Sequence, residues 1–179
     1  MARVRLIAVP LGVLLIGAAS LASAAGSPAL HAEARLVAGD GRPVGWARFV
    51  EDGTGRVHVS AHVTGMSPGL HGIHIHAIGA CEPSAFTSAG GHHNPLGVAH
   101  GLDSAGGGHA GDLPNLVVNE DGVGRLSATT IRATLSPGLR SMFDADGSAV
   151  VIHAGQDDQV TDPTGNSGAR VACGVITRD

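Results

Sequence analysis

Alternation of apolar and polar residues is the clearest pattern in this 179-residue chain. In the segment VHVSAHV (57–63), Val57, Val59, Ala61 and Val63 fall on one face of a strand and the polar residues on the other. Similar runs lie at 34–37, 44–50, 116–118 and 126–129, and two more continuously apolar runs lie at 149–152 and 171–176. No stretch after the first 24 residues keeps an apolar 3.6-residue period for three turns. The pattern therefore predicts an all-β protein.

Turn signals separate these runs and set the expected architecture. Clusters of Gly, Pro, Asp and Ser stand at 39–41, 51–53, 67–69, 120–122 and 136–138. Short strands with a turn every dozen or so residues predict an antiparallel sandwich or barrel. Two longer segments, 77–114 and 155–168, break the rhythm. Loops of this length in a compact domain are functional or disordered, and the abundance of histidine in the first indicates a functional one.

The first residues follow the order of a secretory signal. Arg3 and Arg5 precede an apolar run over 6–19, and small residues end in ASA at 22–24. We expect residues 1–24 to be a cleaved signal peptide and 25–179 to form one exported domain, periplasmic or extracellular. An uncleaved anchor is the alternative, although the apolar run is short and rich in Gly and Ala for a membrane span. No span is expected in the mature chain.

The net charge limits the possible binding partners, and the two cysteines indicate a disulfide. Removal of two arginines with the signal takes the formal net charge from -4 to -6, which argues against nucleic acid and anionic membranes as partners. Cys81 and Cys173 are an isolated pair, and in an exported protein such a pair predicts a disulfide. It would close a loop of roughly 90 residues and stabilise the fold by about 4 to 5 kcal/mol. Two free thiols or thiolate ligands are the alternative.

Histidines concentrate in and around the first long segment. His74 and His76 are two apart in a strand-like segment, so both imidazoles lie on one face. The other candidate ligands are His92, His100, His109, Asp112 and His153. Imidazole sets suit copper or zinc, and three imidazoles with a carboxylate suit tetrahedral zinc. Seven ligands are one short of two four-coordinate sites, and one histidine shared between two metals would close the gap. His31, His58 and His62 are read as ordinary surface residues.

Several motifs in order carry a family resemblance. They are GLHGIHIH (69–76), TSAGGHHNP (87–95), HAGDL (109–113), HAGQDD (153–158) and GNSGARVACGVI (165–176). Each is weak alone, but together they resemble the copper/zinc superoxide dismutase family over about residues 34–176. The resemblance implies an eight-stranded antiparallel Greek-key β-barrel or sandwich with two long functional loops. It also implies an oxidoreductase that converts superoxide to oxygen and hydrogen peroxide.

The same resemblance assigns residues to roles. It implies one copper per subunit at His74, His76, His92 and His153, and one zinc at His92, His100, His109 and Asp112. His92 would bridge the two metals, and Arg170 would attract the superoxide anion, so these two are the expected catalytic residues. Asp157 would link a copper ligand to a zinc ligand, Cys81 would pair with Cys173, and His71 would be structural.

Two departures from the family and three open alternatives remain. His93 stands where many members carry an aromatic residue, and we interpret it as structural. The segment 159–167 is short and lacks lysine, so steering of the substrate would rest on Arg170. The sequence leaves a monomer and a homodimer equally open. A copper or zinc buffer and a barrel that has lost its metals are the rival functions, and both are disfavoured because every ligand position and Arg170 are filled.

Overall fold

The computed structural model describes residues 29–179, so the predicted signal peptide over 1–24 lies outside the described residues. The chain there forms ten strands and one short 3-10 helix, η1. The bounds are β1 Leu30–Ala38, β2 Pro43–Glu51, β3 Val57–Val63, β4 Gly69–His71, β5 Ile73–His76, η1 Thr87–Ala89, β6 Leu116–Val118, β7 Gly124–Thr130, β8 Ala149–His153, β9 Arg170–Val175 and β10 Thr177–Arg178. Within residues 29–179 no helix is long and apolar enough to cross a membrane.

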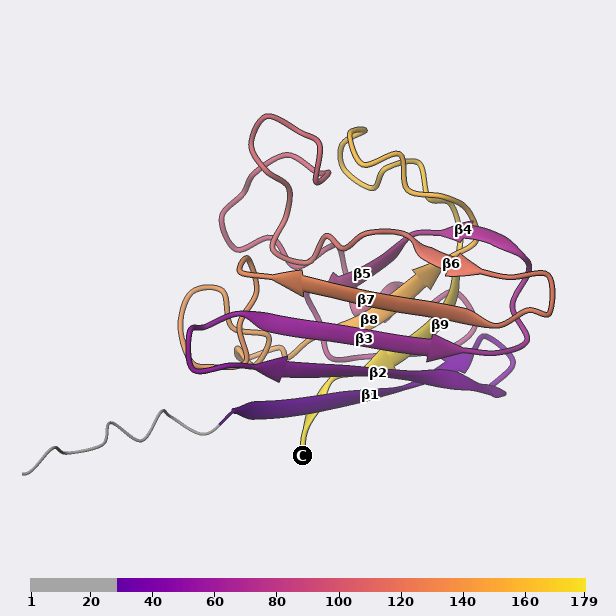
Figure 1. Ribbon diagram of the computed structural model, residues 1–179, viewed down its shortest axis with the longest axis horizontal. Coiled ribbons are helices and arrows are strands. Elements are labelled where there is room, and N and C mark those ends of the chain that lie inside the picture. Colours follow the sequence, from indigo (N-terminus) through magenta and orange to yellow (C-terminus); the bar gives the residue numbers. More distant parts are fainter. Residues whose placement is uncertain (1–28) are drawn as a thin grey trace, which may run out of the picture.

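The strands form one antiparallel sheet that is almost closed into a barrel (Figure 1). Nine of them follow the order β4-β6-β7-β3-β2-β1-β9-β8-β5, and β10 pairs with β1 beside this path. β4 and β5 lie at opposite ends of the path but are separated in the chain by Gly72 alone. The segment 69–76 therefore joins the two edges. Counted as one strand, it makes eight on the path, in agreement with the predicted barrel.

The alternation seen in the sequence matches the burial of the strands. In β3, Val57, Val59 and Val63 are buried in the core while His58 is exposed. β8, from Ala149 to His153, is buried throughout because its outer face is also covered. The cover is a small second apolar cluster that includes Phe86 and Ala89 from the first long loop. All seven predicted strand runs are strands in the structure, whereas the short β4 and β10 were not predicted.

Both long loops rise from the same side of the barrel, as Figure 1 shows. The first joins β5 to β6 and the second joins β8 to β9. The predicted disulfide is confirmed, since Cys81 in the first loop is bonded to Cys173 in β9. Gly72 lies beneath them, and a Cβ there would stand 2.8 Å from the Cβ of Ser167 and 3.1 Å from Cε1 of His74. Only glycine fits at this closure of the barrel.

A third connection, over residues 131–148 between β7 and β8, was not singled out by the sequence. Glu51, at the end of β2, holds it in place although its side chain is buried. Its carboxylate accepts hydrogen bonds from the backbone N–H of Leu135 (2.5 Å), the backbone N–H of Ser136 (2.7 Å) and the hydroxyl of Ser136 (2.6 Å). This buried acid thus anchors a connection that contains no strand or helix apart from the bridge between Thr134 and Ser141.

Replacement of Glu51 by alanine is expected to lower the free energy of unfolding by about 3 kcal/mol or more, because it leaves buried donors without acceptors. Urea unfolding monitored by circular dichroism measures the change. Glu33→Ala is the control, since Glu33 on β1 makes only a 3.6 Å contact with a highly exposed Arg35. A loss at Glu51 no larger than that at Glu33 would contradict the anchoring role.

Candidate metal centre

Four buried histidines from three parts of the chain meet at the base of the two loops. His74 and His76 come from β5, His153 ends the neighbouring β8, and His92 comes from the first loop. A single β-bridge between His76 and His92 ties the loop to the strand. One nitrogen from each of the four rings lies within 4.8 Å of the others. The sheet thus brings together residues that are up to 79 positions apart in the chain.

Hydrogen bonds fix which nitrogen of each ring faces the centre of this group. Nε2 of His74 donates to Asp157 Oδ2 (2.6 Å), Nδ1 of His76 to the carbonyl of Gly90 (2.9 Å), and Nδ1 of His153 to the carbonyl of Gly168 (3.0 Å). In a neutral imidazole the other nitrogen then carries a lone pair. Those nitrogens, His74 Nδ1, His76 Nε2 and His153 Nε2, are buried and have no hydrogen-bond partner, and the same is true of His92 Nε2.

Unpartnered buried nitrogens are unusual because burial without a hydrogen bond is costly. Four of them converging on one point are the arrangement that a metal ion requires. The second nitrogen of three rings is held by a carboxylate or carbonyl, which is the usual support of a metal-binding imidazole. The four residues therefore fit a metal that prefers nitrogen ligands, such as copper.

A second group of four ligands centres on Asp112. Its Oδ1 lies 2.9 Å from His92 Nδ1, 3.0 Å from His100 Nδ1 and 3.3 Å from His109 Nδ1. Four ligands at about 2.0 to 2.1 Å from a tetrahedral zinc would be about 3.3 Å apart. The observed separations are therefore close to those of a closed zinc site. The other carboxylate oxygen of Asp112 accepts from the backbone N–H of Gly101 and His109, both at 2.8 Å.

His92 belongs to both groups. Its Nδ1 lies among the ligands around Asp112, and its unpartnered Nε2 lies among the four imidazoles. One ring thus presents a nitrogen to each of two adjacent centres. This is the arrangement that the count of seven ligands required.

Asp157 joins the two groups from behind. Its Oδ2 accepts from His74, and its Oδ1 accepts from Nε2 of His100 at 3.0 Å. Asn115 holds Asp157 in turn, because its side-chain amide bonds both the carbonyl and the N–H of Asp157 at 2.8 Å. At Gly165 a side chain would collide with the Asp157 carboxylate and the His100 ring, so glycine is required there.

Burial keeps the imidazoles in the form that binds metals. Desolvation lowers the pKa of His74 to about 3, of His76 to about 2 and of His153 to about 4. Burial acts in the opposite sense on Asp112, but hydrogen bonds from His92, Gly101 and His109 outweigh it and the pKa of this carboxyl is lowered. The pKa of Asp157 is lowered for the same reason, by His74 and His100. At neutral pH the neutral rings of His74, His76 and His153 therefore lie near the ionised carboxylates of Asp112 and Asp157.

These pKa values predict that the metal-free protein loses stability in acid. The three imidazoles protonate near pH 6.5 when unfolded but only at or below about pH 4 when folded. Between these values the unfolded chain binds more protons, so stability falls as the pH falls, by up to about 1.4 kcal/mol per pH unit for each ring. Urea unfolding of the metal-free protein at pH 7 and pH 5 measures the loss. His153→Asn should flatten the dependence, and equal stability at the two pH values would contradict the prediction.

Arg170, the first residue of β9, lies beside the four-histidine group. Its guanidinium donates from Nη1 to the carbonyl of Phe86 (2.7 Å) and from Nη2 to the carbonyl of Gly90 (2.6 Å). The Gly90 carbonyl is the same one that orients His76. Partial burial lowers the pKa of Arg170 from its ordinary value, and the group stays charged at neutral pH. A fixed positive charge therefore borders the histidines.

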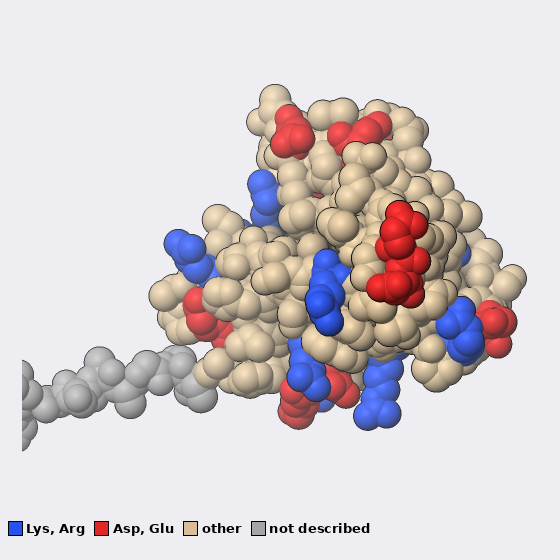
Figure 2. Space-filling view, turned by 45° about the vertical axis from the view of Figure 1, so that its right-hand side comes forward, with Lys and Arg blue, Asp and Glu red and all other residues tan. Residues whose placement is uncertain are grey.

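The loops around Arg170 carry negative charge only. Residues 77–115 and 154–169 contain no lysine or arginine, but they contain Glu82, Asp103, Asp112, Asp157, Asp158 and Asp162. Figure 2 shows acidic side chains at the top of the molecule, where these loops stand. Arg170, at the start of β9, is thus the one cation next to these two loops in the chain, whereas Arg132 and Arg140 of the connection 131–148 line a pocket with residues of the first loop.

Two further histidines lie close to the metal groups without joining them. Nδ1 of His71 lies 2.7 Å from the carbonyl oxygen of His153, and Nε2 lies 2.9 Å from that of Ser67. Both nitrogens are therefore occupied by the backbone. His93 is also buried and belongs to neither group, and its Nε2 is 3.4 Å from the carbonyl oxygen of Arg140. Desolvation lowers the pKa of His93, which keeps it neutral.

Comparison with known proteins agrees with this geometry. The family model described as copper/zinc superoxide dismutase matches residues 44–176. The chain belongs to the copper/zinc superoxide dismutase family. A copper/zinc superoxide dismutase of Aquifex aeolicus is 42% identical over 164 residues, which is 90% of this chain and 95% of that protein. One from Caulobacter vibrioides is 39% identical, covering 81% of this chain and 84% of that protein.

Comparison with solved structures supports the same family assignment. A SOD-like protein from Bacillus subtilis has a TM-score of 0.76 at 38% identity, and it covers 80% of this chain and 96% of that chain. A double mutant of that protein also has a TM-score of 0.76, at 40% identity, covering 80% of this chain and 95% of the other. The predicted all-β fold and the predicted superoxide dismutase family are therefore confirmed.

The structure adds site residues that the sequence did not reveal. Phe86 and Gly90 act through their carbonyl groups, and Asn115 acts through Asp157. A backbone carbonyl leaves no signal in residue type, and a lone asparagine before a strand is ordinary. The left-handed φ of 53° at buried Phe86 shows that the loop is bent to present this carbonyl, but it is visible only in three dimensions.

Proposed function

We propose that this protein is a superoxide dismutase with a copper held by His74, His76, His92 and His153 and a zinc held by His92, His100, His109 and Asp112. The observation that carries the assignment is the placement of His92, whose two nitrogens face two different buried ligand groups. The first group offers four nitrogens and suits copper, and the second offers three nitrogens and a carboxylate and suits zinc.

Bound copper supplies the one-electron oxidation and reduction that convert two superoxide ions and two protons to oxygen and hydrogen peroxide, and the residues of the chain prepare the site for it. Arg170 binds the anion, because its guanidinium is fixed by Phe86 and Gly90 next to His76. Nε2 of His92 would bind either copper or a proton, so it could carry a proton for peroxide formation only when it is not bound to copper. Asp157 keeps His74 and His100 in fixed tautomers, so the two groups of ligands keep their relative positions.

A metal buffer is the rival function, because it would use the same ligands without turnover. Arg170 favours the enzyme, since a buffer has no need for a fixed cation beside the ligands. Metal analysis of the purified protein together with a superoxide consumption assay decides between them. Copper and zinc near one each per chain with rapid consumption support the proposal. Bound metals without consumption would support the buffer, and absence of both metals after reconstitution would exclude both functions.

Export and assembly are further parts of the proposal. Residues 1–24 would be removed as a signal peptide, leaving residues 25–179 as the periplasmic or extracellular enzyme. The charged start, apolar run and ASA at 22–24 support this. Mass spectrometry of the protein recovered from outside the cytoplasm should give a chain that begins at residue 25. Analytical ultracentrifugation of the mature chain distinguishes a monomer from a homodimer.

A further inference from the structure

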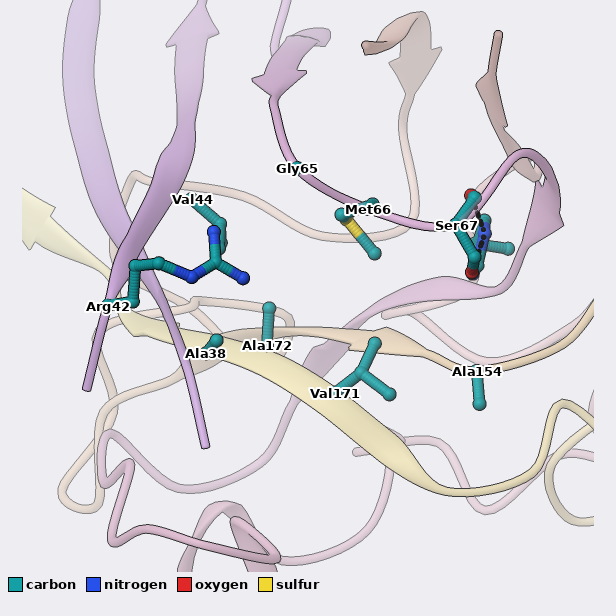
Figure 3. Close-up of a pocket in the computed structure, with 10 residues that line it drawn as sticks. Ala38, Arg42, Val44, Gly65, Met66, Ser67, Ala154, Val171 and Ala172 are labelled. Atoms are coloured by element: carbon teal, nitrogen blue, oxygen red, sulfur yellow. Dashed lines mark hydrogen bonds between the residues drawn. The ribbon is translucent and has the colours of Figure 1, made fainter. Parts of the chain in front are cut away.

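A groove with a volume of about 230 Å³ lies on the barrel beside the four-histidine group, and it contains none of the candidate metal ligands. Its nearest lining residues are His71, whose ring lies 2.7 Å from the carbonyl oxygen of His153, and Ala154. It is bordered by the turn between β1 and β2, by the segment 64–68 that leads to β4, and by the start of β9 (Figure 3). Its floor is built from small apolar side chains, Ala38, Val44, Val171 and Ala172. Met66 closes it from the opposite side, with its thioether directed toward the floor in Figure 3. The floor of the groove is therefore apolar.

One end of the groove carries an arginine side chain. Arg42 stands there, and no aspartate or glutamate is among the lining residues. The guanidinium of Arg42 makes no hydrogen bond to any other residue in 29–179, and its ion pair with Asp40 is long, at 3.9 Å, between side chains that are 52% and 68% exposed. Such a contact neutralises little of the charge. The donors of Arg42 are therefore available to a ligand.

The other end of the groove is polar. Ser67 lies there with His71, whose ring nitrogens are both taken by backbone carbonyls. The hydroxyl of Ser67 has only a long contact, 3.5 Å, with the His71 ring. The groove thus has the guanidinium of Arg42 at one end, an apolar floor in the middle, and Ser67 and His71 at the other end.

We propose that this groove binds a small organic acid, with its carboxylate on Arg42 and its apolar chain on the floor beneath Met66. A guanidinium matches a carboxylate because both are planar and form two parallel hydrogen bonds. An apolar cavity of about 150 Å³ holds benzene, so a chain of about six carbons fits here. An inorganic anion would leave the apolar floor uncovered, and a neutral alcohol would leave Arg42 without a partner.

Titration of the full chain with hexanoate tests the site, with the methyl NMR signals of Met66, Val44 and Val171 as the readout. We expect saturable shifts at these methyls and about tenfold weaker binding of 1-hexanol, because one charge-assisted contact is lost. Hexylammonium should not bind. Arg42→Gln should reduce hexanoate binding to the level of hexanol. Arg56→Gln, which removes an exposed arginine in the turn between β2 and β3, should leave binding unchanged.

Ala38→Leu provides a second test, because it fills the groove and keeps Arg42. Its hexanoate binding should be lost while its thermal midpoint stays close to that of the wild type. Equal affinity for hexanoate and hexanol, unchanged binding in Arg42→Gln, or shifts spread evenly over the molecule would each overturn the proposal. None of these measurements depends on metals or on superoxide consumption, so the outcome is separate from that of the proposed function.

Discussion

Replacement of Arg170 by glutamate is expected to reduce superoxide consumption at low salt by between about 10-fold and 1000-fold. The substitution turns the one cation on the loops and strand end around the site into an anion. The substrate is then repelled by residue 170 as well as by the exposed acidic residues of the two loops, Glu82, Asp103, Asp158 and Asp162. The rate of the wild type should fall as salt is added, whereas the rate of the variant should rise, because salt screens attraction in one and repulsion in the other. Pulse radiolysis over a series of ionic strengths measures both.

A lower rate in Arg170→Glu can be attributed to the lost charge only if the variant binds as much copper and zinc as the wild type. Arg170 also donates to Phe86 and Gly90, and Gly90 orients His76, so the substitution can disturb a ligand. Arg170→Gln separates the effects, since it keeps donors for the carbonyls and removes only the charge. Both variants should keep the wild-type copper and zinc content. Arg56→Glu makes the same charge change at an exposed turn and should alter the rate by less than twofold. Unchanged consumption at low salt in Arg170→Glu would contradict the role of Arg170.

Replacement of His92 by alanine is expected to be the most damaging change to the centre. It removes one nitrogen from each ligand group, leaving three ligands for copper and three for zinc. We expect zinc affinity to fall by at least about 100-fold and superoxide consumption to fall to a similar extent. The copper spectrum should change as well, because the shared imidazole is gone. Competition with a chelator and electron paramagnetic resonance measure the two effects.

His93→Phe is the matched control for His92→Ala. His93 is the next residue in the chain, it is buried, and its ring lies outside both groups of ligands. Its loss removes only a long contact of 3.4 Å to the carbonyl of Arg140. Metal content and copper spectrum should therefore match the wild type. A copper spectrum in His92→Ala that is the same as in the wild type would refute the shared ligand.

Much of the fold was predictable because the information is local. Side chains alternate across a strand with a period of two, so the buried residues of β3 and β7 can be recognised in the sequence. The long loops were recognisable because glycine, proline and histidine replace that alternation. The connection over 131–148 was missed because its anchor, Glu51, is 84 residues away from Leu135, and one acidic residue at a strand end gives no local signal. The break between β4 and β5 is decided by barrel closure at Gly72.

The sequence by itself determined the strands, the disulfide pair, the seven candidate ligands and the need for one of them to be shared. These depend on residue type and short spacing, which a chain carries whether or not it is folded. Only the tertiary structure decided which nitrogen of each ring faces the centre of the four-histidine group. The carbonyls of Gly90 and Gly168 and the carboxylate of Asp157 select the tautomers of His76, His153 and His74, and these partners reach the rings only when the barrel closes. The position of the Arg170 charge depends on the fold in the same way, because two backbone carbonyls from a distant loop hold it.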